Sequence, residues 1–575
     1  MKLIEALTIL REPIPEDAPE LRLFLASGFT PLYLKTFLAA QLRGRFPQHR
    51  VVIDTGLYGD LAGNIERLEP ARFRSLVVIA EWEDLDPRLG IRRLGGWRPL
   101  SLADIEESAQ RSADRLKKAL LNATEFVSTV VCMPTLPLPP LFWMQPDRSS
   151  STELRLREKL ASLAVALSGQ PRVQVANAEL LSELSPIGQR FDLNFGLIAG
   201  FPYTLPHASA LASLIANLID NQTPKKGLIT DLDDTLWAGI LGEDGISGIS
   251  WDMEHRTHVH GLYQQFVASL AGAGVLVAVA SKNDPALVEQ AFDRSDLLIS
   301  KSEIFPFEVG WSRKSESVSR ILDTWNVGAD SVVFIDDSPA EIAEVKAAFT
   351  ELECILFPRH DLQGIWNLLK DLRRFFGKSS LTEDDSLRLN SIRSTIASQA
   401  QFRSTDNTLD DFLRAAESTI TFSLARNSGD IRALELINKT NQFNLNGRRI
   451  NDSEWQHLLS DPASLMLVAS YRDKYGSLGK IAVILATFRE HRLFVHNWVM
   501  SCRAFSRRIE HQCLKYLFDT FGANEVVLDY QPTLRNAPLQ TFLGEFLSGL
   551  DEPVLRITRE RFEAAVPQLF HQIEG

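Results

Sequence analysis

Two aspartates in one short segment have the spacing that phosphoryl-transfer chemistry requires. The segment Asp231-Leu-Asp233-Asp-Thr235 follows the apolar run Gly227–Thr230, which has the length of a buried strand. Asp231 would attack a phosphorus atom to form an aspartyl-phosphate. Asp233 would protonate the leaving oxygen and then deprotonate the hydrolytic water. The carboxylate oxygens of this segment also suit Mg²⁺ as ligands.

Polar side chains also follow two later apolar runs of the same region. Ser281-Lys-Asn283 comes directly after Val275–Ala280, and Asp336-Asp337 comes directly after Ser331–Ile335. Lys314 lies between these two segments in the sequence. Parallel strands place their carboxyl ends at one edge of a sheet, where ligands bind. The sequence therefore predicts that these groups converge on the two motif aspartates.

The chemistry assigns a role to each of these side chains. Ser281 would hydrogen-bond a phosphoryl oxygen, and Lys314 would neutralise charge on the phosphoryl group and on the nucleophile. Mg²⁺, the predicted cofactor, would allow an anionic carboxylate to approach an anionic phosphate. The predicted metal ligands are Asp231, Asp233, Asp336 and Asp337, and the predicted substrate- or phosphate-binding side chains are Thr235, Lys282 and Asn283.

The elements that must position these groups belong to an α/β protein with three predicted domains. Residues 1–222 alternate apolar strands with helical stretches, which is typical of a parallel α/β sheet. Residues 223–378 form the central α/β domain that carries the candidate site. Residues 379–575 begin with a polar linker and continue with long apolar strands and a helix from about Arg507, which indicates an α+β domain.

Length and composition restrict the class of protein. A chain of 575 residues is too long for one core. Its net charge of -12 argues against a nucleic-acid or anionic-membrane partner. The four cysteines lack the spacing of a zinc site or a disulfide framework. The N-terminus becomes acidic too early for a signal peptide, and no apolar run approaches the ~18 residues of a membrane span. We expect a soluble, cytoplasmic protein.

The ordered set Asp231, Asp233, Ser281, Lys314 and Asp336 resembles the haloacid dehalogenase (HAD) superfamily of aspartate-nucleophile phosphotransferases. Within that superfamily, the chain resembles the FkbH-like branch in several longer segments. These are Asp231–Gly245, Ser281–Asp284, Phe334–Glu341, and, beyond the central domain, Leu436–Leu445 and Met500–Arg503. The resemblance covers roughly residues 225–575.

The resemblance implies a specific activity. FkbH-like proteins take the glyceryl group from 1,3-bisphosphoglycerate, remove phosphate, and load the acyl group on the phosphopantetheine thiol of an acyl carrier protein. They serve polyketide and related secondary-metabolite pathways. The partners implied for this chain are therefore an acyl carrier protein and a small phosphorylated substrate.

One residue departs from the family pattern. Many FkbH-like members have Cys between the two motif aspartates, whereas this chain has Leu232, which cannot carry an acyl group. Another thiol can serve instead, the carrier thiol can attack directly, the acyl chemistry can be lost, or the substrate can differ. Cys502, followed by Arg503, is the available alternative thiol because nearby cations lower a thiol pKa. The competing interpretation of Cys502 is a small buried residue at a strand end.

The flanking domains resemble two other folds. The C-terminal domain resembles the GNAT acyltransferase fold, in which a helix N-terminus binds the pyrophosphate of the pantetheine donor. Its corresponding segment, Arg503–Glu510, lacks the usual glycines. We predict a pantetheine site that includes Cys502, Arg503 and Asn441, against a purely structural role for these residues.

The N-terminal domain resembles a degenerate SGNH hydrolase. Ser27 and His207 occupy the positions of its nucleophile and base, but Thr204 replaces the orienting acid of a catalytic triad. We therefore expect a docking role for this domain rather than hydrolysis.

Three functions remain open from the sequence. The first is acyl loading on a carrier protein coupled to dephosphorylation. The second is a phosphatase of another small phosphorylated metabolite without acyl transfer, which Leu232 favours. The third is a carrier-protein docking scaffold with vestigial chemistry, which the intact set of polar residues at the strand ends argues against.

Overall fold

The computed structural model describes most of the 575 residues. The described ranges are 1–91, 98–139, 147–220, 223–378, 409–424, 430–440, 442–450, 452–460, 463–474, 476–501, 504–505, 507–533, 536–547, 549–550, 552 and 554–574. Contacts divide the chain into two compact units, Met1–Gln222 with Asn451–His457, and Thr223–Ile450 with Leu458–Gly575. The predicted α/β class is confirmed by two parallel sheets and one mixed sheet. The division into three domains stays a prediction.

The first unit contains a five-stranded parallel sheet, the N-terminal sheet, in the order β2-β1-β3-β4-β5. Its strands are β1 (Glu20–Ser27), β2 (Arg50–Thr55), β3 (Ser75–Ile79), β4 (Ser128–Cys132) and β5 (Val173–Val175). Its helices are α1 (Leu3–Arg11), α2 (Leu32–Arg45), α3 (Leu61–Glu66), α4 (Trp82–Leu85), α5 (Leu102–Thr124), α6 (Ser151–Ser168), α7 (Ala178–Leu184), α8 (Leu193–Ala199) and α9 (Leu205–Asp220).

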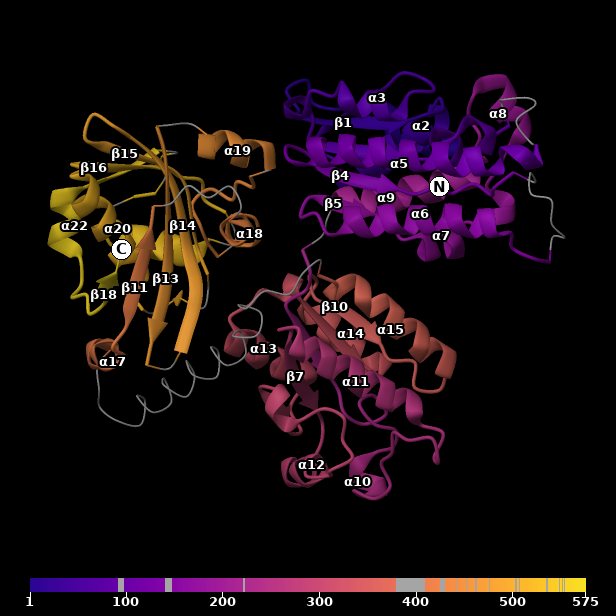
Figure 1. Ribbon diagram of the computed structural model, residues 1–575. Helices are drawn as coiled ribbons and strands as arrows, with labels where there is room; N and C mark the ends of the chain where they lie inside the picture. The colour runs from indigo at the N-terminus through magenta and orange to yellow at the C-terminus, as the bar shows by residue number, and fades with distance from the viewer. Residues whose placement is uncertain are drawn as a thin grey trace. The chain divides into compact units, whose positions relative to one another are not determined.

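Helices cover both faces of the N-terminal sheet (Figure 1). Val77 and Ile79 of β3 pack against α1, α2 and α9, whereas Leu76 and Val78 pack against α3, α5 and α6. Neighbouring residues of a strand point to opposite faces, so a strand buried on both sides is apolar throughout. The continuous apolar runs Leu21–Ala26, Val51–Ile53, Leu76–Ala80 and Phe126–Cys132 predict four of these strands, β1 to β4, and the short β5 was missed.

The second unit contains another five-stranded parallel sheet, the central sheet, in the order β10-β9-β6-β7-β8. Its strands are β6 (Gly227–Thr230), β7 (Leu276–Ser281), β8 (Phe307–Val309), β9 (Val332–Asp336) and β10 (Glu353–Leu356). Its helices are α10 (Leu241–Asp244), α11 (His258–Gly272), α12 (Pro285–Phe292), α13 (Lys314–Trp325), α14 (Pro339–Ala348) and α15 (Leu362–Phe376).

The central sheet is also buried on both faces. Leu228 and Val277 pack in one core with residues of α11, α12 and α15, and Ile229 and Ala278 pack in the other with residues of α13 and α14. The three predicted strands, β6, β7 and β9, are the three adjacent central strands of this sheet. The edge strands β8 and β10 were not predicted, because they are short and only half buried.

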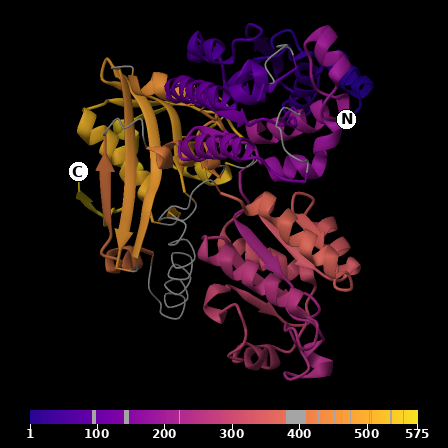
Figure 2. The same ribbon diagram turned by 45° about the vertical axis from the view of Figure 1, so that its right-hand side comes forward.

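The second unit also holds an eight-stranded mixed sheet, the C-terminal sheet. Its path is β17-β16-β15-β14-β13-β11-β18, with β12 paired to β15. The long strands β13 and β14 lie side by side (Figures 1 and 2). The strands are β11 (Thr419–Ser423), β12 (Phe443–Asn444), β13 (Ser464–Asp473), β14 (Gly476–Arg489), β15 (Arg492–Met500), β16 (Glu525–Asp529), β17 (Val554–Thr558) and β18 (Gln572–Glu574). The helices from α17 onward are α17 (Leu409–Ala415), α18 (Ile431–Lys439), α19 (Asp452–Ser460), α20 (Ile509–Phe521), α21 (Ala537–Gly544) and α22 (Arg559–Ala565).

Within the ranges given above, no helix combines the length and the apolar character that crossing a membrane requires.

The side chains of Ser27 and His207 form hydrogen bonds with other groups and not with each other. The Ser27 hydroxyl donates to the Phe29 carbonyl oxygen at 2.8 Å. His207 is fully buried, with its Nε2 3.0 Å from Thr135 Oγ1 and its Nδ1 3.0 Å from Ser185 Oγ. Both ring nitrogens are therefore occupied by hydroxyl groups. This arrangement provides no base for Ser27.

The burial of His207 leads to a prediction about how the stability of the fold depends on pH. Burial, and secondarily the charge of Arg190, lowers the pKa of His207 from 6.5 to about 3. The folded state then binds fewer protons than the unfolded state between these two pH values, so stability falls as pH drops through this window. His207→Gln removes this proton linkage. We expect the stability difference between wild type and variant to shrink on acidification from pH 6.5, by at most about 1.4 kcal/mol per pH unit.

The measurement is hydrogen-exchange protection of the β3 amides in both proteins at each pH, because the comparison cancels the intrinsic pH dependence of exchange. A difference that stays constant from pH 6.5 to pH 4 would contradict the prediction.

Candidate active site

The candidate site lies at the carboxyl edge of the central sheet, where β6, β7 and β9 end side by side. Asp231 follows β6, and its amide donates to the Ile335 carbonyl oxygen of β9 at 2.9 Å. Behind it, the Tyr263 hydroxyl of α11 donates to Thr230 Oγ1 at 3.0 Å. The backbone at Asp231 is therefore fixed by two neighbouring elements before any ligand binds.

Lys314 connects two of the carboxylates at this edge. It is the first residue of α13, and its Nζ lies 2.7 Å from Asp231 Oδ1 and 2.8 Å from Asp336 Oδ2. The same Nζ donates to the Ala280 carbonyl oxygen of β7 at 2.6 Å. The Lys314 side chain is only 3% exposed. Burial disfavours its charge, but the two carboxylates prevail and raise the pKa of Lys314.

Asp231, Asp336 and Asp337 form a cluster that can hold a metal ion. One carboxylate oxygen from each lies within 4.8 Å of the others. Burial, followed by the charge of Asp231, raises the pKa of Asp336 and of Asp337 to about 6 each. Three carboxylates in this largely buried site repel one another, and Lys314 and Arg359 offset only part of that charge. The donor set, all oxygen and all acidic, fits a hard divalent cation such as Mg²⁺.

Asp233 lies outside this carboxylate cluster because its oxygens have other partners. Oδ1 accepts from Trp237 Nε1 at 2.9 Å and from the Leu241 amide at 3.2 Å, and Oδ2 accepts from Asn283 Nδ2 at 2.8 Å. Burial outweighs these hydrogen bonds and raises the pKa of Asp233. A carboxyl group with a raised pKa is suited to donate a proton. The geometry of Asp233 therefore agrees better with a role as a proton donor than with a role as a fourth carboxylate ligand of a metal ion.

The other predicted residues of the central site have different environments. Ser281 is buried at the end of β7, and Asn283 is buried against Asp233. Lys282 is more exposed, and its Nζ lies 2.7 Å from Glu341 Oε1. Thr235 is fully buried, and its Oγ1 has no hydrogen-bond partner among the described residues. The structure therefore brings Ser281 and Asn283 to the edge, whereas Lys282 pairs with α14 at the surface.

Arg359 is a residue of the site that the sequence analysis missed. Its Nη1 lies 2.7 Å from Asp337 Oδ2 and 2.9 Å from Asp234 Oδ2, so it joins the loops after β9 and β6. Asp234 has a φ of 50°, and its Oδ1 accepts from the Gly239 amide at 2.9 Å. Arg359 follows β10, an edge strand that the sequence did not reveal. Recognition of β10 would have placed this arginine at the same edge.

The motif loop is anchored in the core by its apolar residues. Leu232, Leu236 and Trp237 are each 0% exposed and pack in the core under α11 and α12. The carbonyl oxygen of Leu232 accepts from the Leu236 amide at 2.7 Å, which closes the turn that carries Asp233. Leu232 therefore has a packing role beneath the two motif aspartates.

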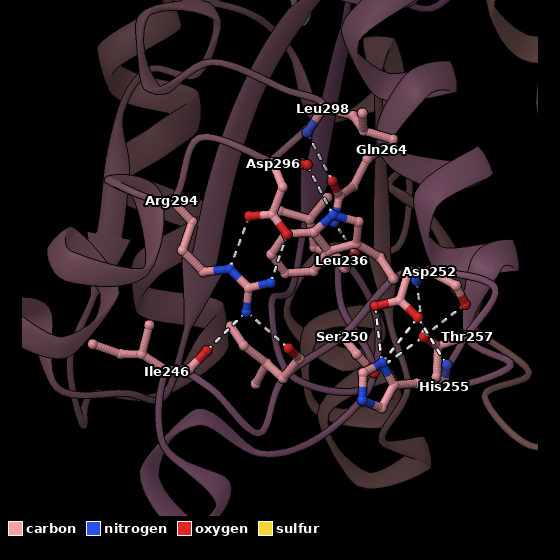
Figure 3. Close-up of polar contacts among 12 residues, drawn as sticks. Leu236, Ile246, Ser250, Asp252, His255, Thr257, Gln264, Arg294, Asp296 and Leu298 are labelled. Carbon is pink, nitrogen blue, oxygen red and sulfur yellow. Dashed lines mark hydrogen bonds and ion pairs between the residues drawn. The ribbon is translucent and has the colours of Figure 1, made fainter.

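A polar network holds the segment that follows the motif (Figure 3). Arg294 Nη1 donates to the carbonyl oxygens of Ile246 and Ile249 at 2.8 and 2.9 Å, and its guanidinium pairs with Asp296. Gln264 of α11 donates to the Leu236 carbonyl oxygen at 3.0 Å and accepts from the Leu298 amide at 3.1 Å. These contacts fix the end of the motif loop and the segment that follows it.

The predicted pantetheine site cannot be placed. Cys502, Arg503 and Asn441 lie outside the described residues. Next to them in sequence, Phe443 of β12 pairs with Met500 of β15. Their predicted role stays a prediction.

Comparisons with known proteins support the fold. No family model and no curated protein matches the sequence. One similar solved structure is the N-terminal part of the protein BF1531 from Bacteroides fragilis, described as containing a phosphatase domain complexed with Mg. It is 18% identical, covers 66% of this chain and 100% of its own, and has a TM-score of 0.52. A second is the cobalt-bound deoxy-D-mannose-octulosonate 8-phosphate phosphatase YrbI from Haemophilus influenzae. It is 21% identical, covers 28% of this chain and 94% of its own, and has a TM-score of 0.21.

The buried contacts of Lys314 predict a large stability effect. Lys314→Met keeps a side chain of similar length but leaves Asp231 and Asp336 without their shared cation. In metal-free buffer we expect the β6 and β9 amides to lose about 3 kcal/mol of hydrogen-exchange protection. Asp231→Asn in the Lys314→Met background should restore part of this loss, because it removes one of the two uncompensated charges.

Lys282→Met is the matched control, since it removes a lysine from the same edge whose partner is Glu341. The cost of this more exposed pair should stay below about 1 kcal/mol. Equal losses in the two lysine variants would contradict the role assigned to Lys314.

Proposed function

We propose that this chain is a Mg²⁺-dependent phosphatase that acts on a small phosphorylated substrate through the nucleophile Asp231. The observation that carries the proposal is the buried contact of Lys314 with both Asp231 and Asp336, beside a third carboxylate, Asp337. The Bacteroides fragilis protein of similar fold is described as containing a phosphatase domain and was solved with Mg, which supports both the activity and the metal.

The proposed reaction has two displacement steps. The Asp231 carboxylate attacks phosphorus, the bond from phosphorus to the leaving oxygen breaks, and Asp233 gives its proton to that oxygen. Asp233, now ionised, takes a proton from water, which attacks the aspartyl-phosphate and releases phosphate with Asp231 restored. Asn283 and Trp237 hold Asp233 in position for both proton transfers.

Charge balance accompanies both steps. Lys314 contacts Asp231 directly and would also neutralise the transferring phosphoryl group. Ser281 would donate to a phosphoryl oxygen at the end of β7. Bound by Asp231, Asp336 and Asp337, Mg²⁺ would offset the repulsion between the anionic nucleophile and the anionic phosphate. We keep Thr235 and Lys282 as proposed phosphate contacts, although Lys282 would have to leave Glu341 to reach the substrate.

A scaffold without chemistry is the less favoured function. Collecting carboxylates and a lysine in a buried cluster costs free energy, because each charge loses its hydration. Perturbed ionisable groups gathered in this way mark sites of chemistry more often than sites of docking.

The nucleophile assignment predicts distinct behaviour for the two motif aspartates. With acetyl phosphate and Mg²⁺, Asp231→Asn should lower the rate of phosphate release at least about 10³-fold. Asp233→Asn should instead accumulate the aspartyl-phosphate, because acetate leaves without a proton whereas the hydrolytic water needs a base. Removal of divalent ions with a chelator should abolish release, and Mg²⁺ should restore it. Intact mass before and after substrate addition detects the added phosphoryl group.

Asp284→Asn serves as the control, since the exposed Asp284 side chain caps α12 by accepting from the Ala286 and Leu287 amides. Wild-type rates in Asp231→Asn would overturn the proposal.

We further propose, on the FkbH-like resemblance, that the substrate is an acyl phosphate such as 1,3-bisphosphoglycerate and that the acyl group passes to an acyl carrier protein in the cytoplasm. The resemblance of segments on both sides of the site, including Leu436–Leu445, supports this finer assignment. For loading, the carrier thiolate would attack the acyl carbon, and the bond from that carbon to the phosphate oxygen would break, so that the leaving phosphate drives thioester formation. Asp231 would then act on the phosphate ester at the other end of 1,3-bisphosphoglycerate, because its attack on the acyl phosphate would release the free acid.

The cysteines that the structure describes argue against a covalent acyl-enzyme on those residues. Cys132 and Cys513 are buried, and burial raises the pKa of Cys132 to about 12 and that of Cys513 further. Burial likewise raises the pKa of Cys354 to about 11. A thiol with a raised pKa is a poor nucleophile at neutral pH. Direct attack by the carrier thiol, or use of Cys502, remains compatible with loading.

Loading and plain hydrolysis predict different products. The protein is incubated with Mg²⁺, 1,3-bisphosphoglycerate and a phosphopantetheinylated carrier, and phosphate release and intact masses are followed. A glyceryl adduct on the carrier is expected for loading, and its loss in Cys502→Ala but not in Cys354→Ala would assign the acyl thiol. Phosphate release with an unmodified carrier would support phosphatase activity without acyl transfer.

A further inference from the structure

The first unit contains a cavity of about 100 Å³ at the carboxyl edge of its own sheet. It is lined by Gly28, which follows β1, and by the segment from Glu81 to Asp84, which follows β3. β1 and β3 are adjacent, and the strand order reverses between them, since β2 lies on the other side of β1. Such a reversal opens a crevice at the carboxyl edge, where ligands bind in parallel α/β sheets. The cavity therefore occupies a position suited to a small molecule.

Asp84 supplies the least satisfied polar group of this cavity. Its Oδ2 accepts from the Glu81 amide at 2.8 Å, and among the described residues its Oδ1 accepts no hydrogen bond and pairs with no cation. The carboxyl lies directly against Gly28, where a Cβ would come within 1.7 Å of Oδ1. Burial, followed by the charges of Glu81 and Glu83, raises the pKa of Asp84 to about 7. The carboxyl is partly exposed and accepts one hydrogen bond from the protein, so a cation in the cavity can reach it.

The neighbouring acid Glu81 is satisfied inside the protein. Its carboxylate accepts from the Thr135 hydroxyl and the Tyr203 hydroxyl at 2.6 Å each, and from the Leu136 amide at 3.2 Å. It therefore organises the wall of the cavity, and burial raises the pKa of Glu81. Asp84 is left as the group that a ligand would contact.

Apart from Glu83, the rest of the lining is apolar and partly aromatic. Phe29 and Trp82 are buried, and Trp82 Nε1 donates to the Leu136 carbonyl oxygen at 2.9 Å, which fixes the indole ring. Phe191 and Pro202 complete the lining around these rings. Carboxylates beside aromatic rings favour a cation, which gains from the carboxylate charge and from the ring faces alike. An anion would be repelled, and a neutral ligand would leave the charge of the cavity uncompensated.

We propose that this cavity binds a small organic cation, an ammonium group on a short aliphatic body, with Asp84 as the counter-ion and the ring of Trp82 as part of the wall. The volume of about 100 Å³ suits a ligand smaller than benzene, since a cavity of about 150 Å³ accommodates that ring. Ser27 and His207 do not line the cavity. This is a binding site and not a hydrolytic one, and it is independent of the phosphatase chemistry proposed at the central sheet.

The test uses the full-length protein and three isosteric probes. Butylammonium, butan-1-ol and butyrate are titrated by calorimetry at pH 8. Butylammonium should bind at least about tenfold more tightly than butan-1-ol, which corresponds to one hydrogen bond to a charged group, and butyrate should not bind. Equal affinity for the amine and the alcohol, or absence of binding for all three, would overturn the proposal.

Variants test whether the charge of Asp84 itself, and not the overall negative charge of the unit, determines the preference for butylammonium. Asp84→Asn should remove the preference for butylammonium over butan-1-ol, and Gly28→Ala should weaken butylammonium binding by displacing the carboxyl. Glu69→Gln, which neutralises an exposed carboxylate of the same unit, is the matched control and should bind like wild type. If Asp84→Asn does not fold, Glu83→Gln tests the same point, because Glu83 also lines the cavity. An unchanged preference for butylammonium over butan-1-ol in the variant that folds would contradict the proposal.

Discussion

The buried ammonium group of Lys314 is the interaction on which the candidate active site depends. It contacts carboxylates that follow β6 and end β9, and it is held by a carbonyl oxygen of β7. Three adjacent strands are therefore joined at one nitrogen atom. Without this cation, Asp231 and Asp336 would lose the positive charge that lies between them. The position of Lys314 at the first residue of α13 also makes the start of that helix part of the site.

The site divides its carboxylates between two environments. Asp231, Asp336 and Asp337 face one another and carry the charge that a divalent cation would satisfy, whereas Asp233 points into hydrogen bonds from Trp237, Leu241 and Asn283. Burial raises the pKa of Asp233 in this second environment. Two carboxyl groups two residues apart can thus take the roles of nucleophile and acid, because their surroundings differ more than their sequence positions do.

The same geometric rule produced a different chemistry in the first unit. There too a parallel sheet gathers side chains at the carboxyl ends of β1 and β3, but the result is an acidic, aromatic-lined cavity in place of a metal-binding cluster. Ser27 and His207 have hydroxyl and carbonyl partners of their own, and the resemblance of this unit to a degenerate hydrolase stays a prediction. A shared fold class therefore left the chemistry to be decided by the residues at each edge.

The sequence alone determined which residue types end the buried strands, because apolar runs on both faces of a parallel sheet are continuous and their ends are visible. It thereby placed Asp231, Ser281 and Asp336 at one edge and predicted the α/β class. Only the tertiary structure decided which groups pair. Lys314 with two carboxylates, Asp233 with Asn283, and Arg359 with Asp234 and Asp337 are contacts between residues 22 to 125 positions apart. Spacing along a chain fixes the neighbours within a strand, but partners across a sheet depend on strand order, and the half-buried edge strands that set this order have no clear pattern.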